Sequence, residues 1–477
     1  MISDLLYEQI VENFGFEPTA EQGEALRALA DFVFSGAGSS AFLLRGYAGT
    51  GKTSIVGALV RTLVQIGMRT VLLAPTGRAA KVFSLYAGHP AYTVHKRIYR
   101  QKVFDVSMDN FQLANNLSKQ TFYIVDEASM ISNDGFSGFG TGRLLDDLVH
   151  YVYGGEGCRL IVLGDSAQLP PVGCDESPAL QRDVLEGYGL AVSEVELSQV
   201  VRQTSTSGIL LNATRLRQMI SEFDVFALPK FRIAGMADVR VVPGNELIEA
   251  LADCYHRCGL DETIVITRSN KRAIVYNNGI RNAVLDREEF LSSGDLIMIA
   301  RNNYYWIKPP EKPSSDASPV EFIANGDVAR VRRVRNQREL YGFTFADVEL
   351  ELPDYDNMEL TATLLLDTLS SESPSLTPSQ NEQLYTAILD DYQDIPQHRE
   401  RMKRLKDDPY YNALQAKFAY AVTCHKAQGG QWQHVFLDQG YLTDDMVGPD
   451  YYRWLYTAIT RATDTLWLVN WREEQTE

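Results

Sequence analysis

The run Gly46-Tyr47-Ala48-Gly49-Thr50-Gly51-Lys52-Thr53 restricts the fold of this chain more than any other feature. It matches the phosphate-binding pattern Gly-x-x-x-x-Gly-Lys-Thr, and it directly follows the apolar segment 41–44, which we expect to be a strand. Glycines let backbone N–H groups turn inward around phosphates, and a helix that begins near Lys52 would point its positive end at the same anion. The order strand, loop, helix therefore predicts a parallel α/β sheet with a nucleotide at its carboxyl edge.

A second acidic site is expected beside this loop. Residues 122–125 form another apolar segment, and Asp126 and Glu127 follow it directly. We predict that Thr53 and Asp126 hold Mg²⁺, that Lys52 reaches the terminal phosphates, and that Glu127 orients and deprotonates the attacking water. ATP and Mg²⁺ are thus the predicted cofactors.

Two sets of short, β-branched strands predict two α/β units. The stretch between the strand at 263 and the strand at 418 lacks this alternation of strands and helices. It holds short β-like pieces to about residue 352, a Ser/Pro-rich acidic segment, and a charged helical segment to about residue 406, so it is interpreted as an insertion into the second unit. The predicted strands are 41–44, 70–74, 122–125 and 160–163, then 263–267, 418–423, 434–437 and 466–469.

The net charge of −17 argues against a protein that coats nucleic acid, because phosphate neutralisation needs concentrated Lys and Arg. Two basic clusters could still supply a local track, and solvated surface faces are the alternative. They are Arg330, Arg332, Arg333, Arg335 and Arg338, and then Arg399, Arg401, Lys403, Arg404 and Lys406.

A cytoplasmic location without membrane contact is predicted. No apolar run approaches the roughly 18 residues that cross a bilayer, and the first residues lack a basic region followed by an apolar core. The 5 scattered cysteines fit a reducing compartment.

Further runs resemble the motifs of superfamily 1 helicases of the RecD and Dda group, from about residue 16 to residue 469. The most specific are residues 164–172 (GDSAQLPPV), which resemble motif III, and residues 423–429 (TCHKAQG), which resemble motif V. The others are residues 18–22 (Q motif), 74–80 (Ia), 93–95 (Ib), 197–203 (IV), 267–270 (a strand-contact motif) and 456–462 (VI).

The resemblance implies the nucleotide site. Gln22 would contact adenine, Gln168 would lie near the γ-phosphate, and Arg202 and Arg461 would face that phosphate from across a cleft. The implied catalytic residues are Lys52, Glu127, Gln168, Arg202 and Arg461, and the implied ATP-binding residues are Gln22, Gly46, Tyr47, Ala48, Gly49, Thr50, Gly51, Lys52, Thr53 and Ser54.

The resemblance also implies a single-stranded DNA track. A satisfied core or capping histidine is the alternative for His95, and Lys426 and Gln428 could contact either the DNA backbone or the nucleotide side. The implied DNA-binding residues are Pro75, Thr76, Arg78, Thr93, His95, Asn270, Thr423, His425 and Lys426.

The implied fold class is α/β, with two RecA-like parallel-sheet motor domains. The first spans residues 1–195 and carries a hairpin at about 99–118, with Phe104 and Phe111, that would separate strands. The second spans 196–292 and 412–477. Residues 293–411 would form an SH3-like β-barrel and a helical insertion. The segment 355–410 within this range is longer than in relatives, and it could bind a protein partner.

The implied function is an ATP-dependent DNA helicase or translocase that moves on single-stranded DNA by an inchworm cycle, 5′ to 3′ as in the resembled group. Single-stranded DNA and duplex junctions are the implied partners. The alternatives are an ATPase subunit of a nuclease or repair complex, and a nucleotide-dependent regulatory scaffold. RNA also stays open as the track, because backbone and stacking contacts do not select against a 2′-hydroxyl.

Overall fold

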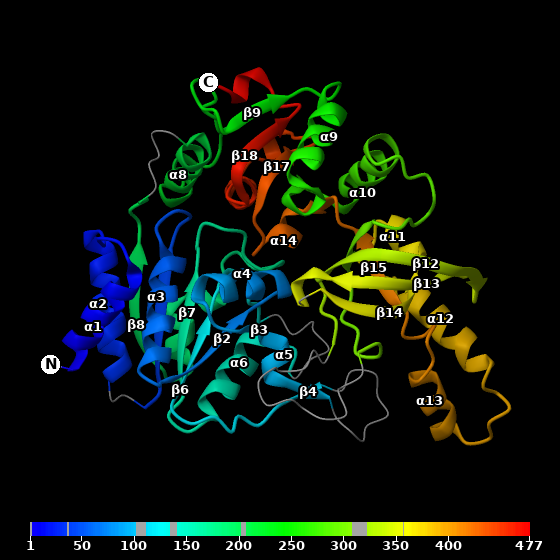
Figure 1. The fold of residues 1–477 in the computed structure, drawn as a ribbon, viewed down its shortest axis with the longest axis horizontal. Helices are drawn as coiled ribbons and strands as arrows, with labels where there is room; N and C mark the ends of the chain where they lie inside the picture. Colours follow the sequence, from blue (N-terminus) through cyan, green and yellow to red (C-terminus); the bar gives the residue numbers. More distant parts are fainter. Residues whose placement is uncertain are drawn as a thin grey trace.

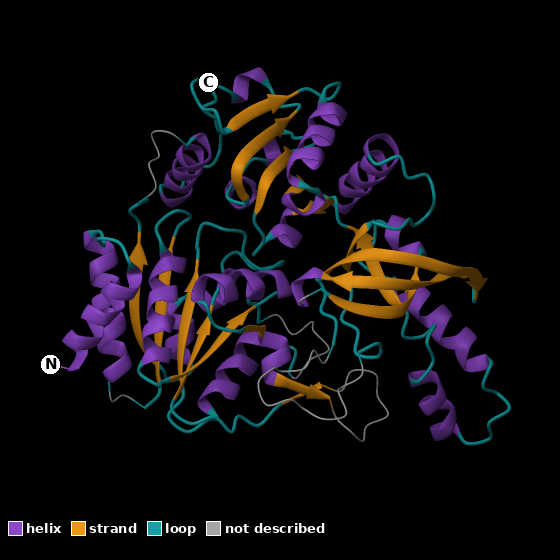
Figure 2. Cartoon of the chain, in the orientation of Figure 1, coloured by secondary structure: helices purple, strands orange, loops and turns teal. Residues whose placement is uncertain are grey.

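The computed structural model describes residues 2–35, 38–101, 111–133, 141–201, 207–307, 322–355 and 357–477. Three bodies make up the molecule, two open sheets flanked by helices and one barrel (Figures 1 and 2). The first open sheet holds the N-terminal elements, the second holds the C-terminal strands, and the barrel lies beside both.

The first body contains a parallel sheet of 6 strands in the order β3-β2-β6-β7-β1-β8. Its faces are buried by two separate apolar clusters, one under α1 to α4 and the other under α5 to α7. The strands are β1 (Ser40–Gly46), β2 (Arg69–Ala74), β3 (Ala91–Thr93), β6 (Thr121–Val125), β7 (Arg159–Gly164) and β8 (Ala191–Leu197); the helices are α1 (Ile2–Phe14), α2 (Ala20–Phe34), α3 (Lys52–Gln65), α4 (Gly77–Ala87), α5 (Val94–Ile98), α6 (Leu144–Tyr153) and α7 (Arg182–Gly187).

The second body contains a parallel sheet of 5 strands in the order β16-β10-β17-β18-β9. Both open sheets have the doubly covered parallel architecture that continuous apolar strands favour. Its strands are β9 (Val239–Val242), β10 (Thr263–Thr267), β16 (Ala421–Thr423), β17 (Trp432–Asp438) and β18 (Ala462–Val469); its helices are α8 (Gly208–Ser221), α9 (Leu247–Cys258), α10 (Asn270–Gly279), α14 (Cys424–Ala427) and α15 (Pro449–Ile459).

The third body is a closed barrel whose core is continuous with that of the second sheet. Buried Asp295 ties the two together, because its carboxylate pairs with Arg281 and Arg287 and accepts a hydrogen bond from Tyr420 at 2.8 Å. The barrel strands are β11 (Leu296–Ile299), β12 (Val328–Leu340), β13 (Phe343–Leu352), β14 (Met358–Leu365) and β15 (Leu414–Phe418).

The expected strand at 418–423 is wrong in one respect. It is two strands, since β15 pairs with β11 and β14 in the barrel, whereas β16 pairs with β10 in the second sheet. The first sheet likewise extends past residue 195, because β8 pairs with β1 as far as Leu197. We therefore propose domain boundaries after Leu197 and after Phe418.

The Ser/Pro-rich segment leads into a helical arm on the barrel. After α11 (Asp367–Ser370), the Thr377 side chain caps α12 (Pro378–Asp390) in a capping box, and α13 (His398–Lys406) packs beside it. Phe343 and Phe345 of β13 share an apolar cluster with Ile388 and Leu405 of the two helices. The arm thus belongs to the barrel's fold.

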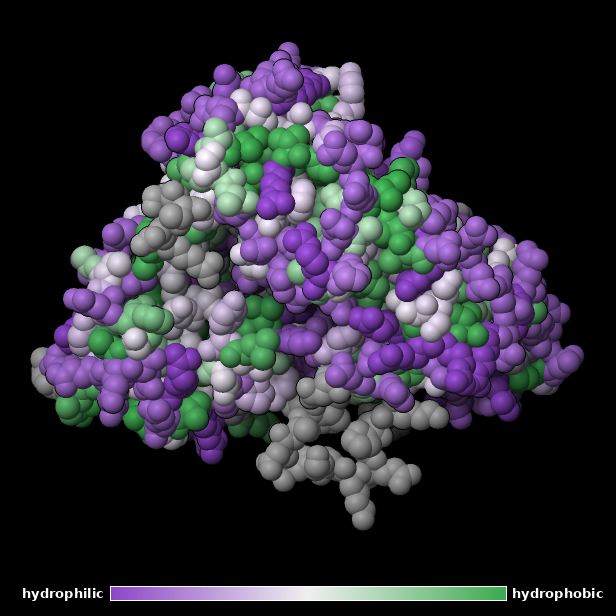
Figure 3. All heavy atoms as spheres, turned by 45° about the horizontal axis from the view of Figure 1, so that its top comes forward, coloured by the Kyte–Doolittle hydropathy of each residue, from purple (hydrophilic) through white to green (hydrophobic). Residues whose placement is uncertain are grey.

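The first basic cluster is neutralised within the barrel. Its arginines lie on β12, and carboxylates on the neighbouring strand β13 pair with them; Arg332 pairs with Glu351, Arg335 with Glu349, and Arg338 with Asp347. These cross-strand pairs satisfy the charges that the sequence offered to a phosphate track. Polar residues cover most of the face in Figure 3. Along the described ranges, no helix has the length and apolar character needed to cross a membrane.

The predicted hairpin is present at its base. β4 (Tyr99–Gln101) and β5 (Phe111–Leu113) pair in antiparallel register. Phe104 lies outside the described residues, as do the side chain of Phe111 and residues 308–321.

Candidate nucleotide and nucleic-acid sites

The phosphate-binding loop joins β1 to α3 as the sequence predicts. Gly51 has a φ of +89°, which favours glycine, and the Gln22 amide lies where a Cβ of residue 51 would be. Lys52 Nζ donates to the carbonyl oxygens of Gly46 and Tyr47. The lysine therefore lies over the loop, at the position from which it can reach phosphate oxygens.

Gln22, the expected adenine contact, is buried against the same loop. Its Nε2 donates to the Thr50 carbonyl at 2.9 Å, and its Oε1 accepts from the Thr19 amide at 3.1 Å. Each of these atoms keeps one further hydrogen-bonding position. Gln22 thus shapes the loop, and its contact with adenine stays a prediction.

Asp126 and Glu127 follow β6 at the carboxyl edge of the sheet. Burial and the adjacent Glu127 carboxylate raise the pKa of Asp126, while Lys52 opposes the shift. Such a buried acidic pair is an environment that a divalent cation stabilises, and Thr53 lies at the start of α3, so the donor set fits Mg²⁺. The cation would neutralise phosphate charge, and Thr53 and Asp126 would hold it.

Arg461 reaches this site from the second body. Its guanidinium lies 3.9 Å from the Glu127 carboxylate, and the side chain is 5% exposed. Nε donates to the Thr457 carbonyl at 3.0 Å, and a terminal nitrogen donates to the Gly430 carbonyl at 3.3 Å. The arginine is thus held in place before any ligand binds. Arg202, its expected counterpart, lies outside the described residues.

Tyr456 connects the two bodies at the phosphate-binding loop, and the sequence analysis assigned it no role. Its hydroxyl donates to the buried Asp165 carboxylate at 2.6 Å and accepts from the Ala48 amide at 2.9 Å. Nearby, the buried Oε1 of Gln168 has no hydrogen-bond partner among the described residues. A buried acceptor without a partner is costly, so Gln168 is suited to receive a ligand or water.

Gln428 connects the DNA-side segment to the nucleotide-side segment. Its Nε2 donates to the Leu169 carbonyl at 2.8 Å, next to Gln168, and the Leu169 amide donates to Thr457 at 2.8 Å. Of the two roles left open for Gln428, the geometry supports the nucleotide-side relay.

Three predicted DNA contacts line one pocket between the second sheet and the barrel: Asn270, Thr423 and Lys426. A second basic group there was not predicted from the sequence: Lys417 of β15, which donates to the carbonyls of Thr368 and Ser371 at 2.6 Å each. Burial, together with the Lys426 charge, lowers the pKa of Lys417 to about 8. No local pattern in the sequence marks Lys417, because it comes from a barrel strand.

The predicted DNA contacts of the first body make hydrogen bonds within the protein. Thr76 and Thr93 cap α4 and α5, so their hydroxyls accept backbone N–H groups. Arg78 stacks 4.1 Å over the Trp432 ring and donates to the Gln431 carbonyl at 3.0 Å, across the cleft between the bodies. It therefore serves as an interdomain contact in this structure.

The two histidines predicted to bind DNA, His95 and His425, are predominantly neutral near pH 7. Burial lowers the pKa of His95 to about 4, and burial also lowers the pKa of His425. A neutral imidazole can donate only one N–H. Pro75, which follows β2, has no amide N–H, so it can shape the strand end and donates nothing itself.

Two family models match this chain. The AAA domain model matches residues 18–220, and the UvrD-like helicase C-terminal domain model matches residues 418–469. The ATP-dependent DNA helicase Dda of Enterobacteria phage T4 is 24% identical over 60% of this chain and 62% of its own length. By these matches the chain is similar to superfamily 1 DNA helicases of the RecD and Dda group.

Other relatives of this chain differ in length. The ATP-dependent RecD2 DNA helicase of Deinococcus radiodurans is 30% identical over 36% of this chain and 21% of its own length. An uncharacterized protein of Acanthamoeba polyphaga mimivirus is 21% identical over 89% of this chain and 94% of its own length. The Bacteroides Pif1 helicase structure with ADP-AlF3 and ssDNA has a TM-score of 0.47 at 16% identity, covering 96% of this chain and 93% of that one.

Proposed function

We propose that this chain is an ATP-dependent helicase that moves on single-stranded DNA and opens duplexes. One observation carries the proposal. Arg461 of the second motor domain faces Glu127 of the first, so the hydrolytic site is complete only when the two bodies lie together. An arginine from a separate domain stabilises transition-state charge and senses the γ-phosphate, which makes closure of the cleft follow the nucleotide.

The contacts between the bodies support an inchworm cycle. Gln428 joins Leu169, next to Gln168, to the segment that carries Thr423 and Lys426, and Tyr456 joins the phosphate-binding loop to α15. When nucleotide closes the cleft, the DNA-side residues of the second body move toward those of the first. Alternate grip by the two bodies then advances the motor along the strand.

We propose single-stranded DNA and duplex junctions as the nucleic-acid partners, with 5′ to 3′ movement as in the group that the chain resembles. The pocket with Asn270, Lys417 and Lys426 supplies cationic and amide donors for a phosphate backbone. RNA is the alternative track. We also propose work in the cytoplasm, since all 5 cysteines are unpaired.

Two other functions fit the sequence less well. A nuclease of its own would need a second metal site. Within the described ranges, no group of three metal-ligating side chains occurs, so a role in a nuclease complex would be as its motor. A regulatory scaffold would need neither an arginine from a second body nor a paired set of strand contacts. The helical arm at 378–406 is a candidate binding site for a protein partner, whether the chain works alone or in a complex.

ATP hydrolysis with and without single-stranded DNA tests the proposal, followed by unwinding of duplexes with a 5′ or a 3′ tail. We expect strong stimulation by DNA and unwinding of the 5′-tailed duplex. ATP turnover that does not respond to DNA but is stimulated by RNA would show that the motor moves on RNA. Indifference to both would favour the scaffold, and unwinding from the 3′ tail alone would reverse the proposed polarity.

A further inference from the structure

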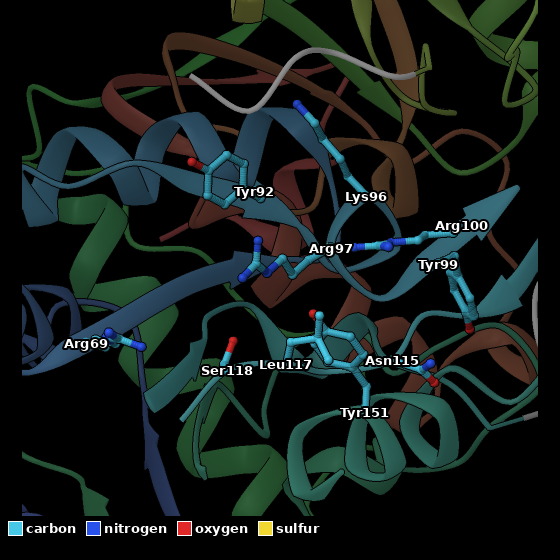
Figure 4. A pocket seen from close by; sticks show the side chains of 10 residues that line it. All are labelled: Arg69, Tyr92, Lys96, Arg97, Tyr99, Arg100, Asn115, Leu117, Ser118 and Tyr151. Carbon is cyan, nitrogen blue, oxygen red and sulfur yellow. The ribbon is translucent and has the colours of Figure 1, made fainter. Parts of the chain in front are cut away.

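A basic cavity of about 370 Å³ lies at the edge of the first sheet, away from the phosphate-binding loop. β3 is the outermost strand at this edge, whereas β1, which carries the loop, lies toward the other edge. The lining residues come from the start of β2, from β3 and α5, from the base of the β4–β5 hairpin, and from α6 (Figure 4). The nucleotide site shares none of them.

Four cations and no carboxylate line the cavity: Arg69, Lys96, Arg97 and Arg100. The arginines of β12, by contrast, pair with carboxylates of β13. Within the part of the chain that the structure describes, Arg69, Arg97 and Arg100 form no ion pair. On a chain with a net charge of −17, three arginines without an ion pair in one cavity favour an anionic ligand.

The cavity wall is built and ordered by hydrogen bonds. Asn116 Nδ2 donates to the Tyr151 carbonyl at 3.0 Å, and Asn116 Oδ1 accepts from the Tyr123 hydroxyl at 2.9 Å, which fixes the segment that lines one side. The Nε of Arg97 is buried and has no partner among the described residues. A guanidinium held with an unsatisfied buried N–H is prepared to donate to an acceptor from outside.

Two of the three aromatic residues that line the cavity are buried and offer no free face for base stacking. Tyr151 is 6% exposed, and Tyr99 is 4% exposed with its hydroxyl bonded to Asp147 at 2.8 Å. Lys96 lies 5.7 Å from the centre of the Tyr92 ring. Single-stranded DNA sites combine cations with exposed aromatic platforms, so this cavity suits a backbone whose bases are already paired.

The position of the cavity agrees with that ligand. Thr93, a predicted strand contact, ends β3, and α5 with Arg97 follows it directly, then β4 with Arg100. The cavity thus lies where the first body continues from the predicted single-strand track into the base of the hairpin. If the hairpin separates the strands, the phosphates next to this point belong to the duplex that has not yet been opened.

We propose that this cavity is a second DNA site, which binds the sugar-phosphate backbone of the duplex ahead of the fork through Arg69, Arg97 and Arg100. The proposal rests on the proposed helicase function and extends it. Duplex held there supplies no sequence preference, because phosphate contacts position the DNA and carry no base information. It keeps the junction against the hairpin while the motor domains step.

Fluorescence anisotropy without nucleotide tests the site on the full chain. Two probes are compared across a salt series: a duplex with a 5′ tail, and the same tail as a single strand. The variants are Arg100→Ala, which is exposed and leaves the core untouched, and Arg97→Ala/Arg100→Ala. Arg182→Ala is the matched control, because Arg182 is an exposed arginine of α7 in the same body.

We expect Arg100→Ala to weaken binding of the tailed duplex by about tenfold and to lower its salt slope by about one, with the single strand bound as before. The double variant lowers the slope by about two, and Arg182→Ala changes neither probe. Unchanged affinity for the tailed duplex would overturn the proposal, and so would an equal loss on both probes, which would place the arginines on the single-strand track.

The test separates the two proposals. The binding comparison uses no ATP, so it judges the cavity whatever the ATPase does. DNA-stimulated turnover of the unmodified chain judges the helicase function, and Arg100→Ala should leave that stimulation by single-stranded DNA unaltered. A motor with normal stimulation but no duplex-specific loss in the variants would keep the proposed function and lose the second site.

Discussion

Glu127 has a left-handed backbone conformation, with φ at +51°, directly after the buried strand β6. Such a conformation is rare outside glycine and costs about 1–3 kcal/mol, and residues that hold it gather at functional sites. Its carboxylate is the group that faces Arg461. The strained turn therefore aims the predicted base at the cleft instead of continuing the strand.

Glu127→Gln should reduce ATP turnover by about 10²- to 10⁴-fold, because the amide cannot take a proton from water. Lys52→Ala should also abolish turnover, with loss of the terminal phosphate contact. Circular dichroism should report an intact fold for both variants. A turnover rate equal to that of the unmodified chain in either variant would contradict the assignment of the site.

Lys417→Met should weaken single-strand binding, because it removes a cation from the pocket that holds Lys426 while keeping a side chain of similar length. The salt slope of binding should fall by about 0.7. Lys417 has a pKa of about 8, so its charge, and with it part of the affinity, is lost as pH rises from 7 to 9. The affinity of the Lys417→Met variant for single-stranded DNA should fall less between pH 7 and pH 9.

Lys119→Met is the control for this series, since Lys119 is an exposed lysine of the first body that pairs with Glu156. It should bind single-stranded DNA as the unmodified chain does at every pH. Equal pH dependence in Lys417→Met and the unmodified chain would show that Lys417 does not touch the strand.

At the scale of elements, α15 lies between the nucleotide side and the DNA-side segment, because its Tyr456 bonds to Asp165 and to Ala48 and its Trp454 carbonyl accepts from Cys424, next to Thr423. Tyr456→Phe keeps the ring and removes both bonds, which leaves the buried Asp165 carboxylate without that donor. We expect ATP affinity to persist and the stimulation of turnover by single-stranded DNA to be lost. Steady-state ATPase assays over a DNA titration measure both the ATP affinity and the stimulation by DNA.

Tyr452→Phe on the same helix is the matched control. Its hydroxyl donates to the Ala227 carbonyl within the second body and does not cross the cleft. A similar loss of stability in both variants is expected, but coupling should fail only in Tyr456→Phe. If both variants keep full stimulation by DNA, the proposed relay through α15 is wrong.

The sequence predicted the elements whose signals are contiguous. Strands such as β10 (Thr263–Thr267) are unbroken β-branched runs, and the phosphate-binding loop carries its own glycines and lysine. Errors arose where one continuous apolar run serves two bodies, as at 418–423, which β15 and β16 divide. Neither strand nor boundary has a turn signal there, since the main chain passes directly from the barrel to the second sheet.

Groups that act across long sequence separations were the ones that pattern reasoning missed. Lys417 meets Asn270 only because the barrel closes, and Arg332 meets Glu351 only through the register of β12 and β13. The charge run on β12 could have supplied a track, but carboxylates on the next strand neutralise it. The arginines of the cavity at the sheet edge lacked such partners, which only the fold could reveal.

At the scale of the whole molecule, polar contacts also join the barrel to the first motor domain. Lys81 of α4 donates to the Pro353 carbonyl at 2.8 Å, and Tyr355 of the barrel donates to Asp327 at 2.7 Å beside Gly77. The barrel, which shares its core with the second body, thus also lies on the first. Movement of the cleft must therefore change the contacts of the barrel with α4.

Arg78 joins the motor domains directly, by its stack on Trp432 and its hydrogen bond to Gln431. Together these contacts contribute about 1–2 kcal/mol to the closed arrangement, so Arg78→Ala should shift the balance toward an open cleft by about 5- to 30-fold. Small-angle X-ray scattering of the nucleotide-free chain should then give a larger radius of gyration. Arg61→Ala, whose contacts stay within the first body, should not change it.

Single-strand binding by Arg78→Ala separates the two roles of this residue. If Arg78 contacts phosphate in the working motor, the salt slope of binding falls by about 0.7 even when nucleotide closes the cleft. If it is an interdomain contact alone, nucleotide restores binding, because closure no longer depends on the stack. An unchanged radius of gyration together with a reduced salt slope would return Arg78 to the DNA track and remove it from the cleft.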